Sequence, residues 1–216
     1  MKKFLIVCLA LLAGCGPDRS FEGKNIYGSE TVAASSSTSS GYMNHPWPDG
    51  NQGTGLGQIV PEQMAWQGYI EGQSNPAPTT LWSRDWYDPT GELGINAVMV
   101  IVANHDCSKC KQEAEFLQNR MAAWKSQDRM IKVTTLLIDS KTGGVASWED
   151  ALDWKKVYYQ VDESVGSDPL STFLTEKVLA MPYHAIINPR TMRIIETQEG
   201  LIDKYDGLVK LADSNK

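Results

Sequence analysis

Apolar residues form two nearly continuous runs in the middle of the chain. Residues 95–103 read Ile-Asn-Ala-Val-Met-Val-Ile-Val-Ala, and residues 131–138 form a second run that Asp139 closes. A short run with few polar residues is typical of a strand that is buried on both faces of a sheet. The pattern therefore predicts two central strands.

Between the two runs, apolar positions recur at steps of three and four residues, which places them on one face of a helix. These positions are Cys107, Cys110, Ala114, Leu117, Met121 and Trp124. We expect a helix here that begins at the end of the first strand, with Asp106 capping its start.

The second half of the chain predicts another helix, a hairpin and a last helix. Residues 147–150, Ser-Trp-Glu-Asp, resemble a capping box that opens a helix running to about Gln160. Residues 183–187 and 192–197 are short strand-like segments, and Asn-Pro-Arg-Thr between them is typical of a hairpin turn. Residues 203–212 predict a final amphipathic helix.

This order of elements predicts an α/β fold. Strand–helix–strand units imply a parallel pair of strands, and the hairpin adds antiparallel strands. We therefore expect a mixed central sheet flanked by helices on both faces. Residues 59–70 have no regular period, so we expect irregular structure there, and the aromatic stretch 82–91 ends in a turn.

The N-terminus carries a different pattern. Lys2 and Lys3 precede an apolar run, residues 4–12, that is too short to span a bilayer as a helix. The run ends in Leu-Ala-Gly-Cys15, which resembles the lipobox of bacterial lipoproteins. The resemblance implies a signal peptide over residues 1–14 and a lipid on Cys15. An ordinary secretory signal is the alternative, but it would not need a cysteine at this place.

Residues 28–57 are rich in Ser, Thr, Gly, Asn and Pro and have no hydrophobic period, as in a flexible linker. We expect a lipidated tether over residues 15–57 and a single folded domain over residues 58–216. A binding segment is the alternative reading of the tether. With a lipid on Cys15, the protein would lie in the cell envelope, facing the periplasm. Gly16, where an Asp would favour the inner membrane, favours the outer membrane.

Composition supports a folded domain and argues against nucleic acid as a partner. Of 216 residues 42% are hydrophobic, including seven Trp and eight Tyr, which is enough for a sizeable core. The formal net charge is −6, and no basic stripe is present that could follow a phosphate backbone.

Four cysteines are present, and two of them carry the candidate chemistry. Cys8 would leave with the signal peptide and Cys15 would be lipidated, so Cys107 and Cys110 would be the free thiols, in an oxidising compartment that favours a disulfide. The free N–H groups and the dipole at a helix start favour a thiolate at Cys107, and Lys109 adds positive charge. A zinc site would need two more ligands. A purely structural disulfide would close a tiny loop and stabilise little.

Residues 103–114, Ala-Asn-His-Asp-Cys-Ser-Lys-Cys-Lys-Gln-Glu-Ala, resemble the active-site segment of thioredoxin-like proteins of the TlpA/redoxin branch. Residues 154–159 resemble the extra helix of that branch, and residues 181–190 resemble its proline loop and the strand after it. The resemblance implies a thioredoxin-like fold and a cis Pro182 beside the cysteine pair. It also implies a thiol–disulfide oxidoreductase without a cofactor, in which Cys107 attacks and Cys110 resolves the mixed disulfide.

The chain departs from this family at two points. Asp106 stands where the family has Trp, and Ser-Lys between the cysteines matches neither the reducing nor the strongly oxidising members. The direction of electron flow is therefore left open. Residues that could tune the thiolate are Asp106, Lys109, His105 and His184. The expected partners are envelope proteins with thiols or disulfides, a redox partner protein, and the membrane through the lipid on Cys15.

Three other functions are weighed against this one. A peroxiredoxin-like peroxidase would need Pro and Thr where Val100 and Asn104 stand. A copper-handling protein could use the two cysteines with His105 or His184, but such thioredoxin-like proteins usually have a Cys-x-x-x-Cys spacing. A binding module that has kept only the fold would not need an intact cysteine pair.

Overall fold

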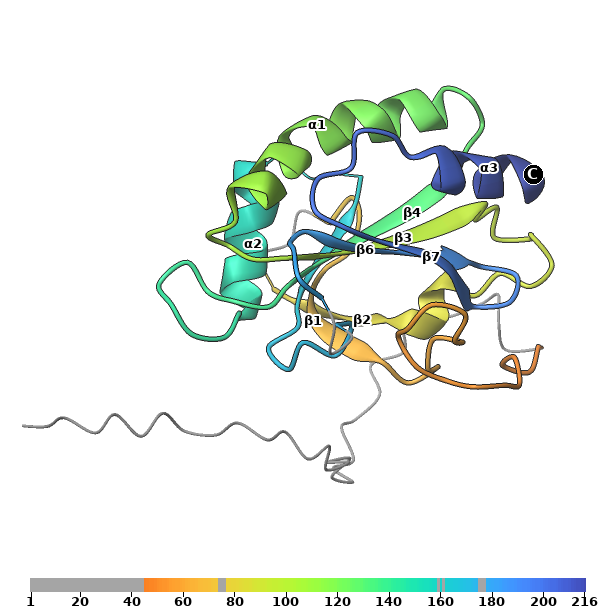
Figure 1. Cartoon of the computed structure of the whole chain (residues 1–216), viewed down its shortest axis with the longest axis horizontal. Helices are drawn as coiled ribbons and strands as arrows, with labels where there is room; N and C mark the ends of the chain where they lie inside the picture. Colours follow the sequence, from red (N-terminus) through yellow and green to blue (C-terminus); the bar gives the residue numbers. More distant parts are fainter. Residues whose placement is uncertain (1–44, 74–76, 159, 161, 175–177) are drawn as a thin grey trace, which may run out of the picture. The chain divides into compact units, whose positions relative to one another are not determined.

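The computed structural model describes residues 45–73, 77–158, 160, 162–174 and 178–216. Their centre is a sheet of seven strands in the order β2-β1-β5-β4-β3-β6-β7 (Figure 1). The strands are β1 (Ala65–Tyr69), β2 (Thr79–Trp82), β3 (Ala97–Ala103), β4 (Ile131–Leu137), β5 (Ser164–Ser167), β6 (Tyr183–Asn188) and β7 (Arg193–Glu199). The helices are the 3-10 helix η1 (Ser83–Trp86) and the α-helices α1 (Ser108–Lys125), α2 (Trp148–Val157) and α3 (Asp206–Ser214).

The two apolar runs form the middle of this sheet. β3 is buried along its whole length and lies between β4, to which it is parallel, and β6, to which it is antiparallel. The connection from β3 to β4 runs through α1, which is the usual way to join neighbouring parallel strands. The predicted central strands, parallel pair and antiparallel hairpin are all confirmed.

Three short strands extend the sheet beyond the predicted elements. β5 joins β4 in parallel, and β1 and β2 follow as antiparallel strands, β1 in a segment where irregular structure was expected. β1 approaches β5 so closely that a Cβ at Gly68 would lie 2.2 Å from the carbonyl oxygen of Val165. Only glycine allows this approach, and a glycine in a short segment hides the strand pattern in the sequence.

The two faces of the sheet are covered differently. Met99 and Ile101 of β3 pack against α1 and α3, and Ala103 packs where α2 meets the start of α1. Val100 and Val102 point to the opposite face. That face is covered by η1 and by segments without regular structure, including Phe173. The expected α/β fold with a mixed central sheet is confirmed. Its α-helices α1, α2 and α3 cover one face, and on the other face the helix is the single 3-10 turn η1.

Part of the predicted tether also packs on the second face. The Trp47 indole N–H donates to the carbonyl oxygen of Val60, at 3.2 Å, and its ring lies 5.0 Å from the ring of Tyr87. Ile59 forms bridges to Gln52 and to Arg193 at the start of β7. The segment that leads into the sheet therefore closes one side of the core.

The predicted signal peptide, the lipid on Cys15 and the tether up to residue 44 lie outside the described residues. Within the described ranges, no helix is both long and apolar enough to cross a membrane.

Candidate functional site

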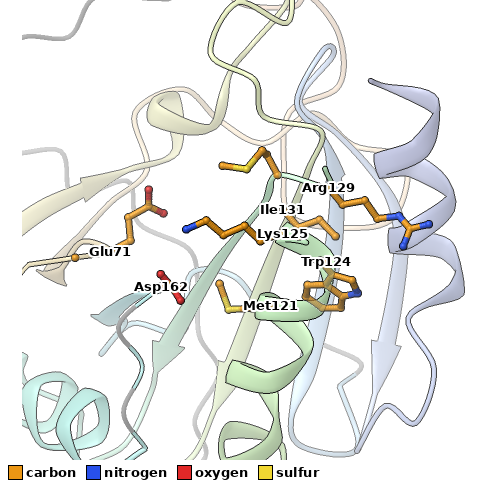
Figure 2. A pocket seen from close by; sticks show the side chains of 9 residues that line it. Glu71, Met121, Trp124, Lys125, Arg129, Ile131 and Asp162 are labelled. Carbon is orange, nitrogen blue, oxygen red and sulfur yellow. The ribbon is translucent and has the colours of Figure 1, made fainter. Parts of the chain in front are cut away.

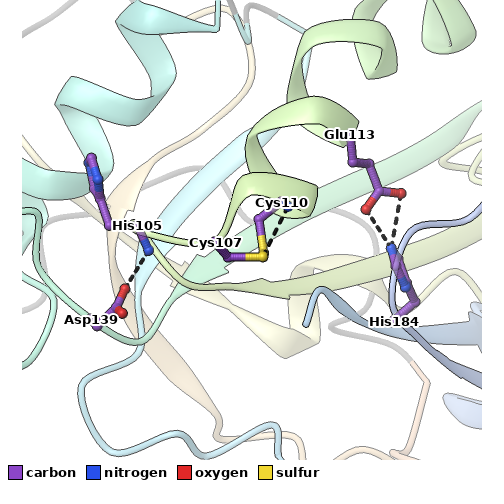
Figure 3. The surroundings of a disulfide bond; sticks show 6 residues. All are labelled: His105, Cys107, Cys110, Glu113, Asp139 and His184. Carbon is purple, nitrogen blue, oxygen red and sulfur yellow. Dashed lines mark hydrogen bonds and ion pairs between the residues drawn. A yellow bond between two sulfur atoms is a disulfide. The ribbon is translucent and has the colours of Figure 1, made fainter. Parts of the chain in front are cut away.

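A disulfide joins Cys107 and Cys110 where β3 hands over to α1 (Figure 3). Cys107 is the N-cap residue of α1, and its sulfur accepts a hydrogen bond from the backbone N–H of Cys110, at 3.1 Å. Cys110 lies inside the first turn and is 3% exposed, whereas Cys107 is only partly buried. The two sulfurs therefore differ in access to solvent.

The capping role predicted for Asp106 is wrong. Asp106 is exposed, and Cys107 occupies the N-cap position with its sulfur as the acceptor. The helix begins one residue later than the Asp106 cap requires, since a cap accepts from N–H groups two or three positions ahead. The Asp106 side chain therefore lies in solvent, where water screens its charge from the cysteine pair.

The peptide bond between Met181 and Pro182 is cis, as predicted from the proline loop. Met181 packs against the same buried cluster as Cys107, a cluster that includes Cys110. Pro182 is buried, and its carbonyl oxygen accepts a hydrogen bond from the N–H of Gly200, at 2.7 Å. The start of β6 is thus held beside the cysteine pair.

Behind the disulfide lies a buried polar group that sequence reasoning missed. Glu113 of α1 is 1% exposed and accepts a hydrogen bond from the hydroxyl of Tyr205, at 2.6 Å. Nε2 of His184 lies 2.8 and 3.0 Å from the two carboxyl oxygens of Glu113. Burial, and then the neighbouring Glu113 carboxylate, raise the pKa of Tyr205. Figure 3 shows Glu113 and His184 facing each other on one side of the first turn of α1.

The sequence held one signal for Glu113. It follows Cys110 by three residues and precedes Leu117 by four, so it belongs to the same helix face. Because a glutamate on a helix is usually exposed to solvent, the sequence did not indicate that Glu113 is buried.

A small cavity connects Cys110 with this buried group. It has a volume of about 10 Å³ for the centre of a water molecule, which is room for about one water. Its walls include Cys110, Glu113, Thr135, Trp154 and Gln160. A proton could pass between the Cys110 sulfur and the Glu113 carboxyl group across a gap of this size.

A second buried pair of ionisable groups, Glu163 and Lys155, lies nearby. Burial raises the pKa of the Glu163 carboxyl group well above its ordinary value, although Lys155 opposes this effect. Burial lowers the pKa of Lys155, whose ammonium group donates to the backbone carbonyls of Gln160 and Glu163. This lysine fixes the turn that enters β5.

The other predicted tuning residues do not join the disulfide in one cluster. The His105 ring packs edge-on against Trp154 of α2, with 5.5 Å between ring centroids, and its backbone N–H donates to the Asp139 carboxylate. Figure 3 shows this ring directed away from the disulfide. Lys109 is exposed on the first turn of α1. His184 is the histidine that the fold brings behind the cysteine pair, through Glu113.

A larger cavity of about 330 Å³ lies at the far end of α1 (Figure 2). Met121, Trp124 and Lys125 of α1 line it together with Glu71 and Asp162. The Lys125 side chain extends across it toward the two carboxylates. None of its lining residues belongs to the cysteine site. Among the described residues, no three His, Cys, Asp or Glu side chains are grouped so that they could hold a metal ion.

A mixed sheet with a Cys-x-x-Cys disulfide at the start of the helix after its central strand, and with a cis-proline directly before β6, is a thioredoxin-like fold. Solved structures with the same fold include two 2-Cys peroxiredoxins. That of Plasmodium vivax has 13% identity, a TM-score of 0.52 and coverage of 73% of this chain and 80% of its own. The mitochondrial protein of Plasmodium falciparum has 11% identity, a TM-score of 0.51 and coverage of 74% and 92%.

The chain is also similar to the thioredoxin domain of a thiol-disulfide oxidoreductase from Bacteroides vulgatus, with 16% identity, a TM-score of 0.48 and coverage of 74% of this chain and 96% of that one. No protein-family model and no curated protein sequence matches the chain. At these identities the likeness concerns the fold, and the chemistry has to be argued from the site.

Proposed function

We propose that this protein is a thiol–disulfide oxidoreductase that acts on protein substrates in the cell envelope, where a lipid on Cys15 anchors it. The observation that carries the proposal is the unequal cysteine pair at the start of α1. Cys107 is the more accessible sulfur and caps the helix, while Cys110 is buried one turn further on. Such a pair supports an attacking thiol and a resolving thiol.

In the reducing direction, the Cys107 thiolate attacks one sulfur of a client disulfide and displaces the other as a thiolate. Cys110 loses its proton and attacks Cys107 in the mixed disulfide. The second client thiolate leaves, so the client gains two electrons and the pair becomes the disulfide seen here. The reverse sequence oxidises a client dithiol, and a redox partner protein restores the pair in either case.

Glu113 is the group placed to take the proton from Cys110. Its carboxyl group lines the same small cavity as Cys110 and is shielded from solvent. A buried base within one water of the thiol lets Cys110 ionise only when it attacks.

The names of similar structures add support of a general kind, since that of Bacteroides vulgatus is the thioredoxin domain of a thiol-disulfide oxidoreductase. The anchoring rests on the lipobox around Cys15, outside the described residues. Labelled fatty acid should enter the wild-type chain and not Cys15→Ala, and equal labelling would reject the anchor.

The oxidoreductase function is tested by trapping clients. The Cys110→Ser variant should accumulate mixed disulfides with envelope proteins through Cys107, because nothing resolves them. The Cys107→Ser variant should trap almost none, although it keeps one thiol of the same pair. Non-reducing electrophoresis of both variants, with the double variant as background, gives the measurement. The proposal fails if Cys110 is the faster thiol or if neither variant traps a partner above the double variant.

A further inference from the structure

Glu113, the proposed proton acceptor, is in contact with two other buried side chains, Tyr205 and His184. Glu113 is buried, and a buried carboxylate without compensating donors is strongly disfavoured relative to its neutral form. Its oxygens are contacted from two elements distant in sequence. The hydroxyl of Tyr205, before α3, donates to Oε1, and Nε2 of His184 in β6 lies at hydrogen-bond distance from both oxygens. What these contacts do to the carboxyl group decides whether it can accept a proton.

Of the two side chains in contact with the Glu113 carboxyl group, His184 makes the more extensive contact. Its Nε2 reaches both carboxyl oxygens, whereas the Tyr205 hydroxyl reaches Oε1 only. His184 is itself completely buried, and its Nδ1 has no hydrogen-bond partner among the described residues. Among the described residues, the hydrogen-bond contacts of the His184 ring are therefore with Glu113.

The position of His184 is fixed by the sheet. It is paired with Ile101 of β3 in the antiparallel ladder, and both side chains point to the face that α1 covers. It follows the cis-proline by two residues. β6 thus places His184 beneath the helix that carries the disulfide, two residues after the cis-proline.

Other ionisable groups surround this pair. From α1 come Cys110 and Arg120, the latter acting on Tyr205, and from the turn before β5 comes Glu163. Lys155 of α2 interacts with Glu163, and its positive charge opposes the effect of burial on the Glu163 carboxyl group.

We infer that His184 is a positioning residue for the proposed reaction: together with Tyr205, it holds the Glu113 carboxyl group in place facing Cys110. The inference rests on the function proposed above. When Cys110 attacks the mixed disulfide, its thiol proton passes to Glu113, either directly or through one water, and the Cys110 sulfur forms the new bond as the client thiolate leaves. Without the contact from His184, the Glu113 carboxyl group is no longer fixed where it can take that proton.

A chromogenic disulfide separates this step from the first attack. The reduced protein is mixed with a substoichiometric amount of dithiobis-nitrobenzoate. The first coloured thiolate reports attack by Cys107, and its rate rises with reagent concentration. The second thiolate is released when Cys110 resolves the adduct, and its rate is independent of the reagent. The second rate is followed from mildly acidic to mildly alkaline pH.

We expect His184→Leu to slow the second release by roughly ten- to a hundredfold near neutral pH, a part of the effect of a general base. The rate should return at alkaline pH, where the Cys110 thiol ionises without the help of a base. His184→Gln offers a neutral amide donor and should recover part of the rate. Tyr205→Phe, which keeps the aromatic ring against Trp124, should cause a smaller loss. The first release should change little in all of them.

The matched control is His45→Gln, which alters a histidine in the segment before the sheet and should leave both phases unchanged. Glu113→Gln should slow the second release without recovery until the Cys110 thiol ionises by itself. The inference is overturned if His184→Leu resolves within about twofold of wild type, or if its slower rate has the same pH profile as wild type. A wild-type protein that shows no second phase would instead reject the oxidoreductase function.

Discussion

Glu163 combines full burial with a carboxyl group whose oxygens have no hydrogen-bond partner among the described residues. Burial raises its pKa well above the ordinary value, and the folded state therefore holds a proton that the unfolded chain releases earlier. The stability that this group contributes is present below the pKa of an unfolded glutamate and is lost as the pH rises through its higher folded value.

The Glu163→Gln variant should therefore be more stable than wild type near neutral pH. Glutamine keeps the neutral shape of the protonated acid and removes the cost of ionisation, which we expect to raise the melting temperature by about 3 °C or more. The advantage should shrink as the pH falls toward the ordinary glutamate range. Thermal unfolding across that range measures it. Glu92→Gln, at an exposed glutamate, is the control and should show no such pH-dependent gain.

The sequence pointed to the residues that form the disulfide and the proline loop, and it missed the buried residues that lie behind them. Cys107, Cys110 and Pro182 stand in recognisable motifs. Glu113 and Tyr205 meet only when α1 and the segment before α3 are folded onto one sheet face, a contact between residues 92 positions apart. No local pattern reports such a distant pairing, so these roles could not be derived from residue type and spacing.

Among the secondary-structure elements, α2 begins with the capping box that its local sequence predicted. Ser147 accepts a hydrogen bond from the N–H of Asp150, and the Asp150 side chain accepts one from the N–H of Ser147, as the capping box predicted. Burial opposes the charge on Asp150, but hydrogen bonds from Ser147 and Ser140 outweigh it and lower the pKa of the carboxyl group. The helix so started carries Trp154 to the wall of the small cavity.

The Ser147→Ala variant should lose about 1 kcal/mol of folding free energy, because one orphan N–H of the helix start loses its acceptor. Chemical denaturation of the purified protein measures the loss. Lys156→Ala changes an exposed side chain of the same helix and should stay within about 0.5 kcal/mol of wild type. Equal effects of the two substitutions would mean that the cap contributes nothing specific.

The elements that escaped prediction are short and contain few large apolar residues. β5 reads Ser-Val-Gly-Ser, and β1 contains Gly68 at the closest approach of the two strands. Their residues give no period, and their pairing is fixed by β4 and by each other rather than by local preference. The longer elements β3, β4, α1 and the β6–β7 hairpin have patterns strong enough to read directly.

For the whole molecule, the segment ahead of β1 belongs to the folded part as much as to the linker. Trp47, Ile59 and Val60 pack in the cluster on the second face of the sheet. A chain that starts at residue 45 keeps all three, while a chain that starts at residue 58 loses Trp47 and the bridge from Gln52 to Ile59.

We expect the chain starting at residue 58 to be less stable by about 1–3 kcal/mol than the chain starting at residue 45, in line with the burial of one large apolar side chain. Thermal unfolding of the two chains under identical conditions measures the difference. Trp47→Ala in the longer chain should reproduce most of it. The same melting temperature for both chains would show that residues 45–57 contribute no stability.

The pairing of this segment with β7 has a further consequence, for contacts between molecules. β7 is the last strand of the sheet, and the backbone on its outer side meets the segment at three points: the N–H of Gly57 donates to Ile194, that of Ile194 to Gln58, and that of Val60 to Met192. An uncovered edge strand offers its free N–H and carbonyl groups to any other chain. Copies crowded on a surface would meet such edges often, and here the protein's own leading segment occupies the first residues of that edge.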